Sequence, residues 1–77
     1  MEVMLFAGLK EMAGQGRILI DTPASLTAGD LKKRIYAQYP SLDGEVFQVA
    51  CNEAFVKDEH NINEHDEVAL IPPVSGG

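Results

Sequence analysis

Short apolar runs bounded by turn residues predict five strands. Each run is rich in branched or aromatic side chains, which is typical of strands. The predicted strands span residues 3–7, 17–21, 46–51, 54–56 and 67–71. The first two are expected to pair antiparallel, because the connection between them is short and holds at most one helical turn, at residues 9–12. A polar, acidic connection fills residues 57–66.

One amphipathic helix is predicted over residues 28–39. Thr27 is a good N-cap, and Asp30 lies in the first turn, where its charge suits the helix dipole. Pro40 ends the helix. The apolar face of the helix is formed by residues spaced four apart: Leu31, Ile35 and Tyr39.

The element order is therefore β-β-α-β-β-β. This order predicts an α+β chain with the β-grasp, or ubiquitin-like, fold, in which one amphipathic helix covers a small mixed sheet. We expect residues 1–71 to form the single domain. Residues 72–77, Pro-Pro-Val-Ser-Gly-Gly, are expected to form a flexible, extended tail.

Alternation along the first and last strands gives the sheet two apolar faces. On the helix side we place Val3, Leu5, Val68 and Leu70, together with Leu31 and Ile35. The open side then carries Met4, Phe6, Ala69 and Ile71, and we include Phe55. An exposed apolar patch of this kind usually marks a protein partner. The alternatives are that loops cover the patch or that a central strand is buried on both sides. A chain this short has little left to form a second layer, which favours a partner.

The composition narrows the function classes. The chain has 77 residues, 45% of them hydrophobic, and a net charge of −6 from 12 acidic and 6 basic residues. Nucleic-acid binding needs clustered cations, and the only basic cluster, Lys32-Lys33-Arg34, points in different directions around a helix. No apolar run approaches the ~20 residues that span a bilayer, and no signal peptide opens the chain. With one cysteine and no disulfide, a cytoplasmic setting without membrane contact is expected.

The tail suits chemistry at a C-terminal carboxylate. Gly76 and Gly77 carry no Cβ, so a nucleophile can approach the terminal carboxylate freely. Adenylation by ATP would activate that group, and sulfur attack would then leave a thiocarboxylate. The alternative is a frayed end or an artefact of expression. The predicted fold and the extended Pro72-Pro73 segment that would lead the tail away from the domain both favour chemistry at the terminal carboxylate.

Residues 67–77, Glu-Val-Ala-Leu-Ile-Pro-Pro-Val-Ser-Gly-Gly, resemble the ending of molybdopterin synthase small subunits, the MoaD-type sulfur carriers. Residues 3–7 and 49–52 resemble the same family, so the similarity covers the whole chain. Carriers for thiazole synthesis and tRNA thiolation share the fold and the Gly-Gly ending. They typically lack the two prolines that precede that ending here. Cys51 departs from the resemblance, because a plain apolar residue is expected there.

The resemblance implies a carrier that is not catalytic on its own and binds no cofactor. An E1-like enzyme would use ATP to adenylate Gly77, and a cysteine-derived sulfur would then give the thiocarboxylate. The tail would enter the large subunit of molybdopterin synthase and pass sulfur to cyclic pyranopterin monophosphate. The implied complex is a heterotetramer of two small and two large subunits. Tail insertion would involve Pro72, Pro73, Val74, Ser75 and Gly76, and the partner interface would fall on Met4, Phe6, Phe55 and Ile71.

Three other constellations are set aside. Cys51 could be a nucleophile or sulfur relay, but the end of an apolar strand favours a small buried hydrophobe. His60 and His65 lie among carboxylates whose spacing matches no standard metal site, so a solvated acidic loop is favoured over a metal. No glycine-rich phosphate loop precedes a helix, so the chain is not expected to bind ATP itself.

Three rival functions stay open. The chain could carry sulfur for thiazole synthesis or tRNA thiolation. It could instead be a ubiquitin-like modifier that is conjugated to proteins through Gly77. The third rival is a β-grasp binding module with an incidental tail.

Overall fold

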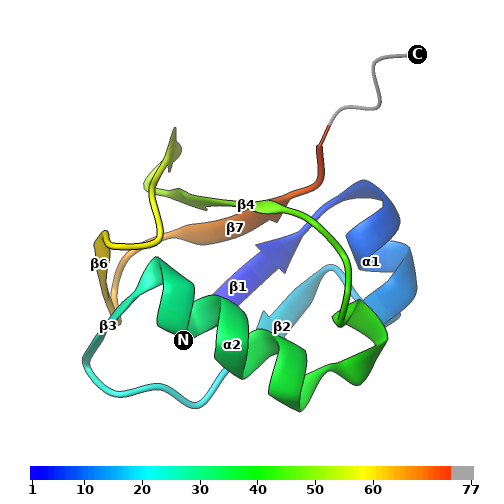
Figure 1. Cartoon of the computed structure of the whole chain (residues 1–77), viewed down its shortest axis with the longest axis horizontal. Coiled ribbons are helices and arrows are strands. Elements are labelled where there is room, and N and C mark those ends of the chain that lie inside the picture. The colour runs from blue at the N-terminus through cyan, green and yellow to red at the C-terminus, as the bar shows by residue number, and fades with distance from the viewer. Residues whose placement is uncertain (74–77) are drawn as a thin grey trace.

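The computed structural model of the chain describes residues 1–73 (Figure 1). A five-stranded sheet has the order β2-β1-β7-β4-β5. Its strands are β1 (Glu2–Leu5), β2 (Arg17–Leu19), β4 (Gln48–Cys51), β5 (Ala54–Phe55) and β7 (Val68–Ile71). β1 and β7 run parallel, and the other neighbours are antiparallel. A separate antiparallel pair is formed by β3 (Ser25–Thr27) and β6 (Asn61–Asn63).

Helix α2 (Ala28–Gln38) covers one face of the sheet, and α1 (Ala7–Ala13) lies near the end of β1 (Figure 1). A 3₁₀ helix, Pro40–Leu42, follows α2. The side chains predicted to pack between the sheet and α2 are all buried: Val3, Leu5, Val68 and Leu70 from the sheet, and Leu31 and Ile35 from α2. The β-grasp prediction and the assignment of this face are therefore confirmed.

Four details of the predicted element order are wrong. No strand was predicted between residues 21 and 28, but Ser25–Thr27 form β3, which pairs with β6. The single turn expected at residues 9–12 is a seven-residue helix, and Ala7, expected to end the first strand, begins that helix with φ 50°. Residues 57–66 are not all connection, because they contain β6. Val46 was placed in a strand but lies outside β4 and is 72% exposed.

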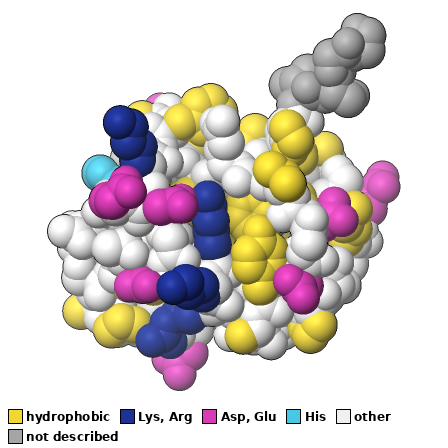
Figure 2. All heavy atoms as spheres, viewed as in Figure 1, with side chains coloured by type: hydrophobic (Ala, Val, Ile, Leu, Met, Phe, Trp, Pro, Cys, Tyr) yellow, Lys and Arg dark blue, Asp and Glu magenta, His cyan; other side chains and the backbone are white. Residues whose placement is uncertain are grey.

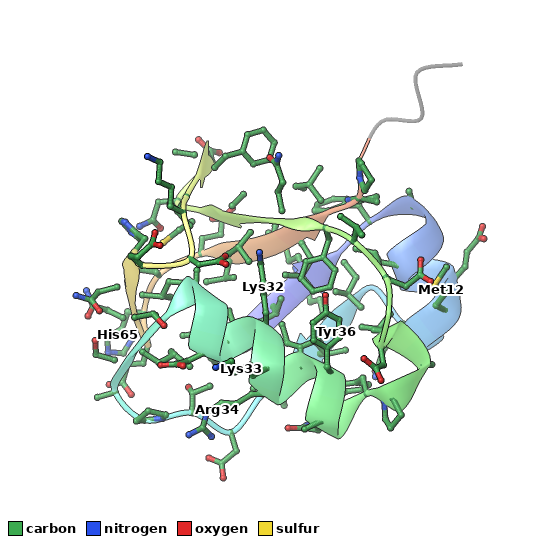
Figure 3. All side chains as sticks on the ribbon, in the orientation of Figure 1. Met12, Lys32, Lys33, Arg34, Tyr36 and His65 are labelled. Atoms are coloured by element: carbon green, nitrogen blue, oxygen red, sulfur yellow. The ribbon has the colours of Figure 1, made fainter. Side chains whose placement is uncertain are left out.

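Charged side chains are mixed on the face that carries α2. Figure 2 shows lysine and arginine side chains interleaved with acidic ones there. Lys32 reaches Asp58, whereas Arg34 donates to the carbonyl of Asp21 at 2.9 Å, so these two cations point apart (Figure 3). Lys33 and Arg34 line one hollow, so the predicted divergence of the basic cluster is confirmed for Lys32 only.

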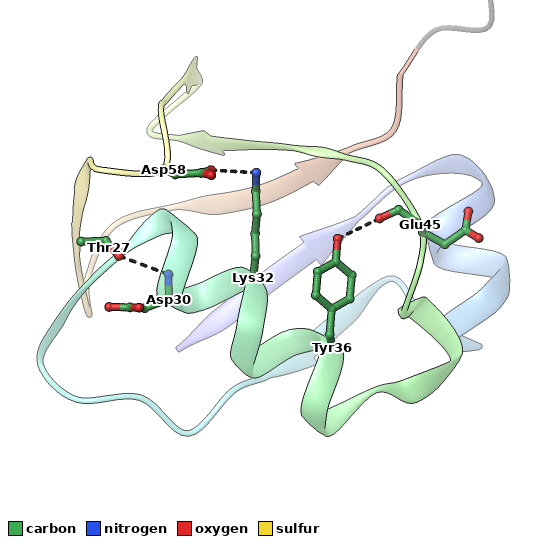
Figure 4. Close-up of polar contacts among 6 residues, drawn as sticks. All are labelled: Thr27, Asp30, Lys32, Tyr36, Glu45 and Asp58. Atoms are coloured by element: carbon green, nitrogen blue, oxygen red, sulfur yellow. Dashed lines mark hydrogen bonds and ion pairs between the residues drawn. The ribbon is translucent and has the colours of Figure 1, made fainter.

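The N-terminus of α2 is fixed by hydrogen bonds from outside the helix. Thr27 Oγ1 accepts from the Asp30 N–H at 3.1 Å, which confirms the predicted N-cap (Figure 4). The N–H groups of Ala28 and Gly29 donate to carbonyls of residues 60 and 58, both at 2.9 Å. Lys32 also pairs with Asp58 at 2.8 Å. These contacts satisfy the donors of the first turn and hold the connection before β6 against the helix.

Candidate partner-binding surface

Five residues form one row across the face of the sheet that α2 leaves open. The register pairs Arg17 with Met4, Met4 with Ala69, Ala69 with Ala50, and Ala50 with Phe55. The two alanines form a low floor between the larger Met4 and Phe55. The result is a hollow of about 290 Å³, which we call the open-face concavity. It is lined by Met4, Phe6, Ala50, Glu53, Phe55, Glu67, Ala69 and Ile71.

The walls of the concavity are apolar and accessible. Phe6 is 46% exposed and Phe55 is 64% exposed, whereas Met4 and Ile71 are half-buried. The sequence placed these four side chains on an uncovered face, and the structure brings all four to one hollow. No loop of the described chain buries the two phenylalanines, so the patch has the exposure expected of a protein-binding surface.

Sequence reasoning missed three lining residues. Ala50 is opposite Phe55, but its face could not be fixed without the register of β4. Glu53 lies in the β4–β5 turn, where alternation gives no signal. Glu67 was predicted to open the last strand, where alternation puts it on the face of Ala69 and Ile71, but it was not counted as a candidate; it lies just before β7. Both are exposed, and they add negative charge to an otherwise apolar hollow.

The C-terminal segment begins at this surface. Ile71 ends β7 and lines the concavity, and the half-buried Pro72 and exposed Pro73 follow it. The remaining predicted tail residues lie outside the described part of the chain: Val74, Ser75, Gly76 and Gly77. A partner that receives the tail would therefore stand next to the concavity.

Asp66 ties the β4–β5 turn to the β6–β7 loop. Its carboxylate accepts from the Asn63 N–H at 2.9 Å and from the Asn52 side chain at 3.3 Å. Asn52 in turn donates its N–H to the Glu67 carbonyl at 2.7 Å, and its side chain accepts from the Glu67 N–H at 3.0 Å. This network fixes the acidic end of the concavity.

Cys51 points away from that surface. It is buried on the α2 side of the sheet, and its Sγ donates to Asp66 Oδ2 at 3.4 Å. Burial raises the pKa of the Cys51 thiol, and the neighbouring Asp66 carboxylate raises it further. A buried, protonated thiol is a poor nucleophile, so the interpretation of Cys51 as a small buried hydrophobe is confirmed.

Acidification is expected to weaken the Asp66 network. Hydrogen bonds from the Asn63 N–H and then the Asn52 side chain hold the pKa of Asp66 below its ordinary value. The folded state therefore favours the charged carboxylate. Its contribution is complete above the pKa of the unfolded chain, about 3.9, and is lost as pH falls through the lower folded-state pKa.

The measurement is the melting temperature of wild type and Asp66→Asn from neutral pH to about pH 3. We expect the variant to melt a few degrees lower at neutral pH, with the gap shrinking below pH 4. A gap that stays constant with pH would contradict the role of the charged form.

The histidines of the acidic connection lie apart from the concavity. His65 Nε2 is 3.5 Å from Glu64 Oε1, and both side chains are largely exposed. Within residues 1–73, no three His, Cys, Asp or Glu side chains are arranged to hold a metal ion. Neither helix in that part of the chain is long and apolar enough to cross a membrane.

A family profile, curated sequences and a solved structure all resemble this chain along nearly its whole length. The sequence profile of the ThiS family matches residues 3–77. The molybdopterin synthase sulfur carrier subunit of Dictyostelium discoideum is 37% identical, over 99% of this chain and 94% of that protein. Small archaeal modifier protein 1 of Haloferax volcanii is 32% identical over the full length of both chains. The crystal structure of SAMP1 from Haloferax volcanii matches with a TM-score of 0.82 and 34% identity, covering 99% of this chain and 97% of that one.

Proposed function

The chain belongs to the ThiS family, and from this premise we propose that it is the sulfur carrier subunit of a molybdopterin synthase. The observation that carries the proposal is its 37% identity to a protein of that name, with nearly complete coverage of both chains. The family match runs to residue 77 and so includes the Gly76-Gly77 pair. The apolar surface beside the C-terminal segment gives such a carrier a place to dock.

The proposed chemistry takes place on the carboxylate of Gly77. This carboxylate attacks the α-phosphorus of ATP in an E1-like enzyme, and pyrophosphate leaves as the acyl adenylate forms. A sulfide-level nucleophile, HS⁻, then adds to the carbonyl, and AMP leaves with one of the original carboxylate oxygens. The net change replaces one oxygen of Gly77 by sulfur. The sulfur of the resulting thiocarboxylate would bond to a carbon of cyclic pyranopterin monophosphate, and water would then cleave the acyl–sulfur bond, which returns Gly77 to a carboxylate.

The proposed partner in the transfer step is the large synthase subunit. Its surface would cover the open-face concavity at Met4, Phe6, Phe55 and Ile71, and its cleft would receive residues 72–77. A few well-packed residues near the centre of an interface, often aromatic or arginine side chains, typically dominate its binding energy. Two small and two large subunits would form the complex. ATP belongs to the activating enzyme, so the carrier itself binds no cofactor.

A reconstitution assay tests the pathway. The thiocarboxylated protein is mixed with the large subunit and cyclic pyranopterin monophosphate, and molybdopterin is measured. We expect product in proportion to the thiocarboxylate supplied. Absence of product, together with sulfur delivery to a thiazole or tRNA substrate, would assign the carrier to another pathway.

A second candidate function is conjugation to other proteins. It is favoured by the 32% identity to small archaeal modifier protein 1 over both full chains. In this case the activated Gly77 carbonyl would be attacked by a lysine amine, and an isopeptide would form. Mass spectrometry of lysine-linked Gly-Gly remnants in cells expressing the chain separates this function from sulfur transfer.

A further inference from the structure

The open-face concavity is charged at one end only. Ile71 and Phe6 lie toward the end from which the chain continues to the C-terminus, whereas Glu67 precedes β7 at the opposite end. Glu53 lines the same end, because hydrogen bonds between Asn52 and Glu67 hold the β4–β5 turn there. Within residues 1–73, neither Glu53 nor Glu67 forms an ion pair. Glu67 also borders a neighbouring hollow lined by Arg17, whose guanidinium lies 3.6 Å from the Glu2 carboxylate. Two carboxylates without an ion-pair partner of their own thus border the apolar concavity.

Glu53 has an unfavourable backbone conformation at this position. It has φ 70° and follows Asn52 at φ 52°, so both residues of the turn are left-handed. Turns of this kind favour Asn at the first position and Gly at the second. Residues held in such conformations tend to cluster at functional sites. The side chain of Glu53 is therefore a candidate for a role that glycine could not fill.

The size of the hollow indicates what can enter it. Its 290 Å³ is about twice the ~150 Å³ cavity that holds a benzene ring, and it is open to solvent. One large apolar side chain fits over Ala50 and Ala69, with a second group beside it. The acidic end, in a protein of net charge −6, suits a cation as that second group.

We propose that Glu53 and Glu67 form a subsite for a lysine or arginine of the docking protein, next to an apolar side chain seated over Ala50 and Ala69. This inference rests on the proposed function, in which the docking protein is the large synthase subunit. Glu67 and Ile71 are four residues apart on one extended segment, which separates them by about 13 Å. A cation bound at Glu53 and Glu67 therefore fixes which end of the concavity faces the cleft that receives the tail.

The test measures affinity for the large synthase subunit at low and at high salt. Glu53→Gln keeps the shape of the side chain and removes its charge, so we expect binding about 3–10-fold weaker at low salt and a smaller difference at high salt. Glu53→Gly removes charge and backbone strain together. It should lose the same affinity without lowering the melting temperature. Glu11→Gln, on the exposed side of α1, removes the same charge away from the concavity and should bind as wild type.

Each outcome has one meaning. Wild-type affinity in both Glu53 variants at low salt would overturn the subsite, while the docking proposal would stand if Phe6→Arg still lost binding. A loss equal at both salt concentrations would also overturn it, because the side chain would then act by packing. Failure of the wild-type chain to bind the large subunit would overturn the proposed function, and the subsite with it.

Discussion

Phe6→Arg is expected to weaken binding to the large synthase subunit by about 30-fold or more, the effect of removing a hot spot worth about 2 kcal/mol. Phe6 lines the concavity and is 46% exposed, so its ring is available to a partner. An arginine there would place a charge in an apolar interface. Phe6 supports the fold through its carbonyl, which accepts from the Leu9 and Lys10 N–H groups at 3.2 and 3.4 Å. The melting temperature should therefore change little.

Met12→Arg is the matched control. Met12 is 45% exposed on α1 and does not line the concavity (Figure 3). The same change of apolar residue to arginine should leave binding intact there. Ala50→Leu provides a second probe, because it fills the floor of the hollow without adding charge. Equal affinity of wild type, Phe6→Arg and Ala50→Leu, measured by calorimetry, would exclude the concavity as the docking surface.

Gly77→Ala is expected to reduce sulfur transfer by about 10- to 100-fold. Its added methyl group lies beside the reacting carbonyl, and small misplacements of reacting groups cost rates of this order. Stability should be unaffected, because the buried hydrophobic residues of the described chain all lie between Val3 and Leu70. The transfer rate and the melting temperature of the variant are measured together.

Deleting Gly77 extends this test. The deletion should abolish thiocarboxylate formation at the native position and leave the melting temperature unchanged. A large drop in melting temperature in either variant would show that the tail contributes to the fold. Full transfer by the deleted chain would make the tail incidental, as in the binding-module hypothesis.

The sequence predicts those parts of the fold that depend on local patterns. Thr27 and the four-residue spacing of Leu31 and Ile35 locate α2, because a cap and an apolar stripe are both short-range signals. β6 was missed because Asn61-Ile62-Asn63 has a single apolar side chain, and its pairing partner β3 is distant in sequence. Ala7 was misassigned because the apolar run continues past Leu5 into α1.

The candidate site was also predictable only where it depends on local sequence patterns. Strand alternation places Met4, Phe6 and Ile71 on the open face, since each belongs to or adjoins a strand whose other face is buried. The hollow between Met4 and Phe55 depends on the register that brings Ala69 and Ala50 between them. Register is a tertiary property, so neither the depth of the concavity nor the position of Glu53 beside Glu67 follows from the chain alone.

The central claim is that Gly77 carries sulfur, and intact-mass spectrometry tests it most directly. The protein and a Gly77 deletion are each incubated with an E1-like activating enzyme, ATP and a sulfur donor. We predict that the full chain gains the mass difference between one sulfur and one oxygen, and that the deletion gains none. An unchanged mass of the full chain, with an enzyme that activates another carrier of the family, would contradict the account.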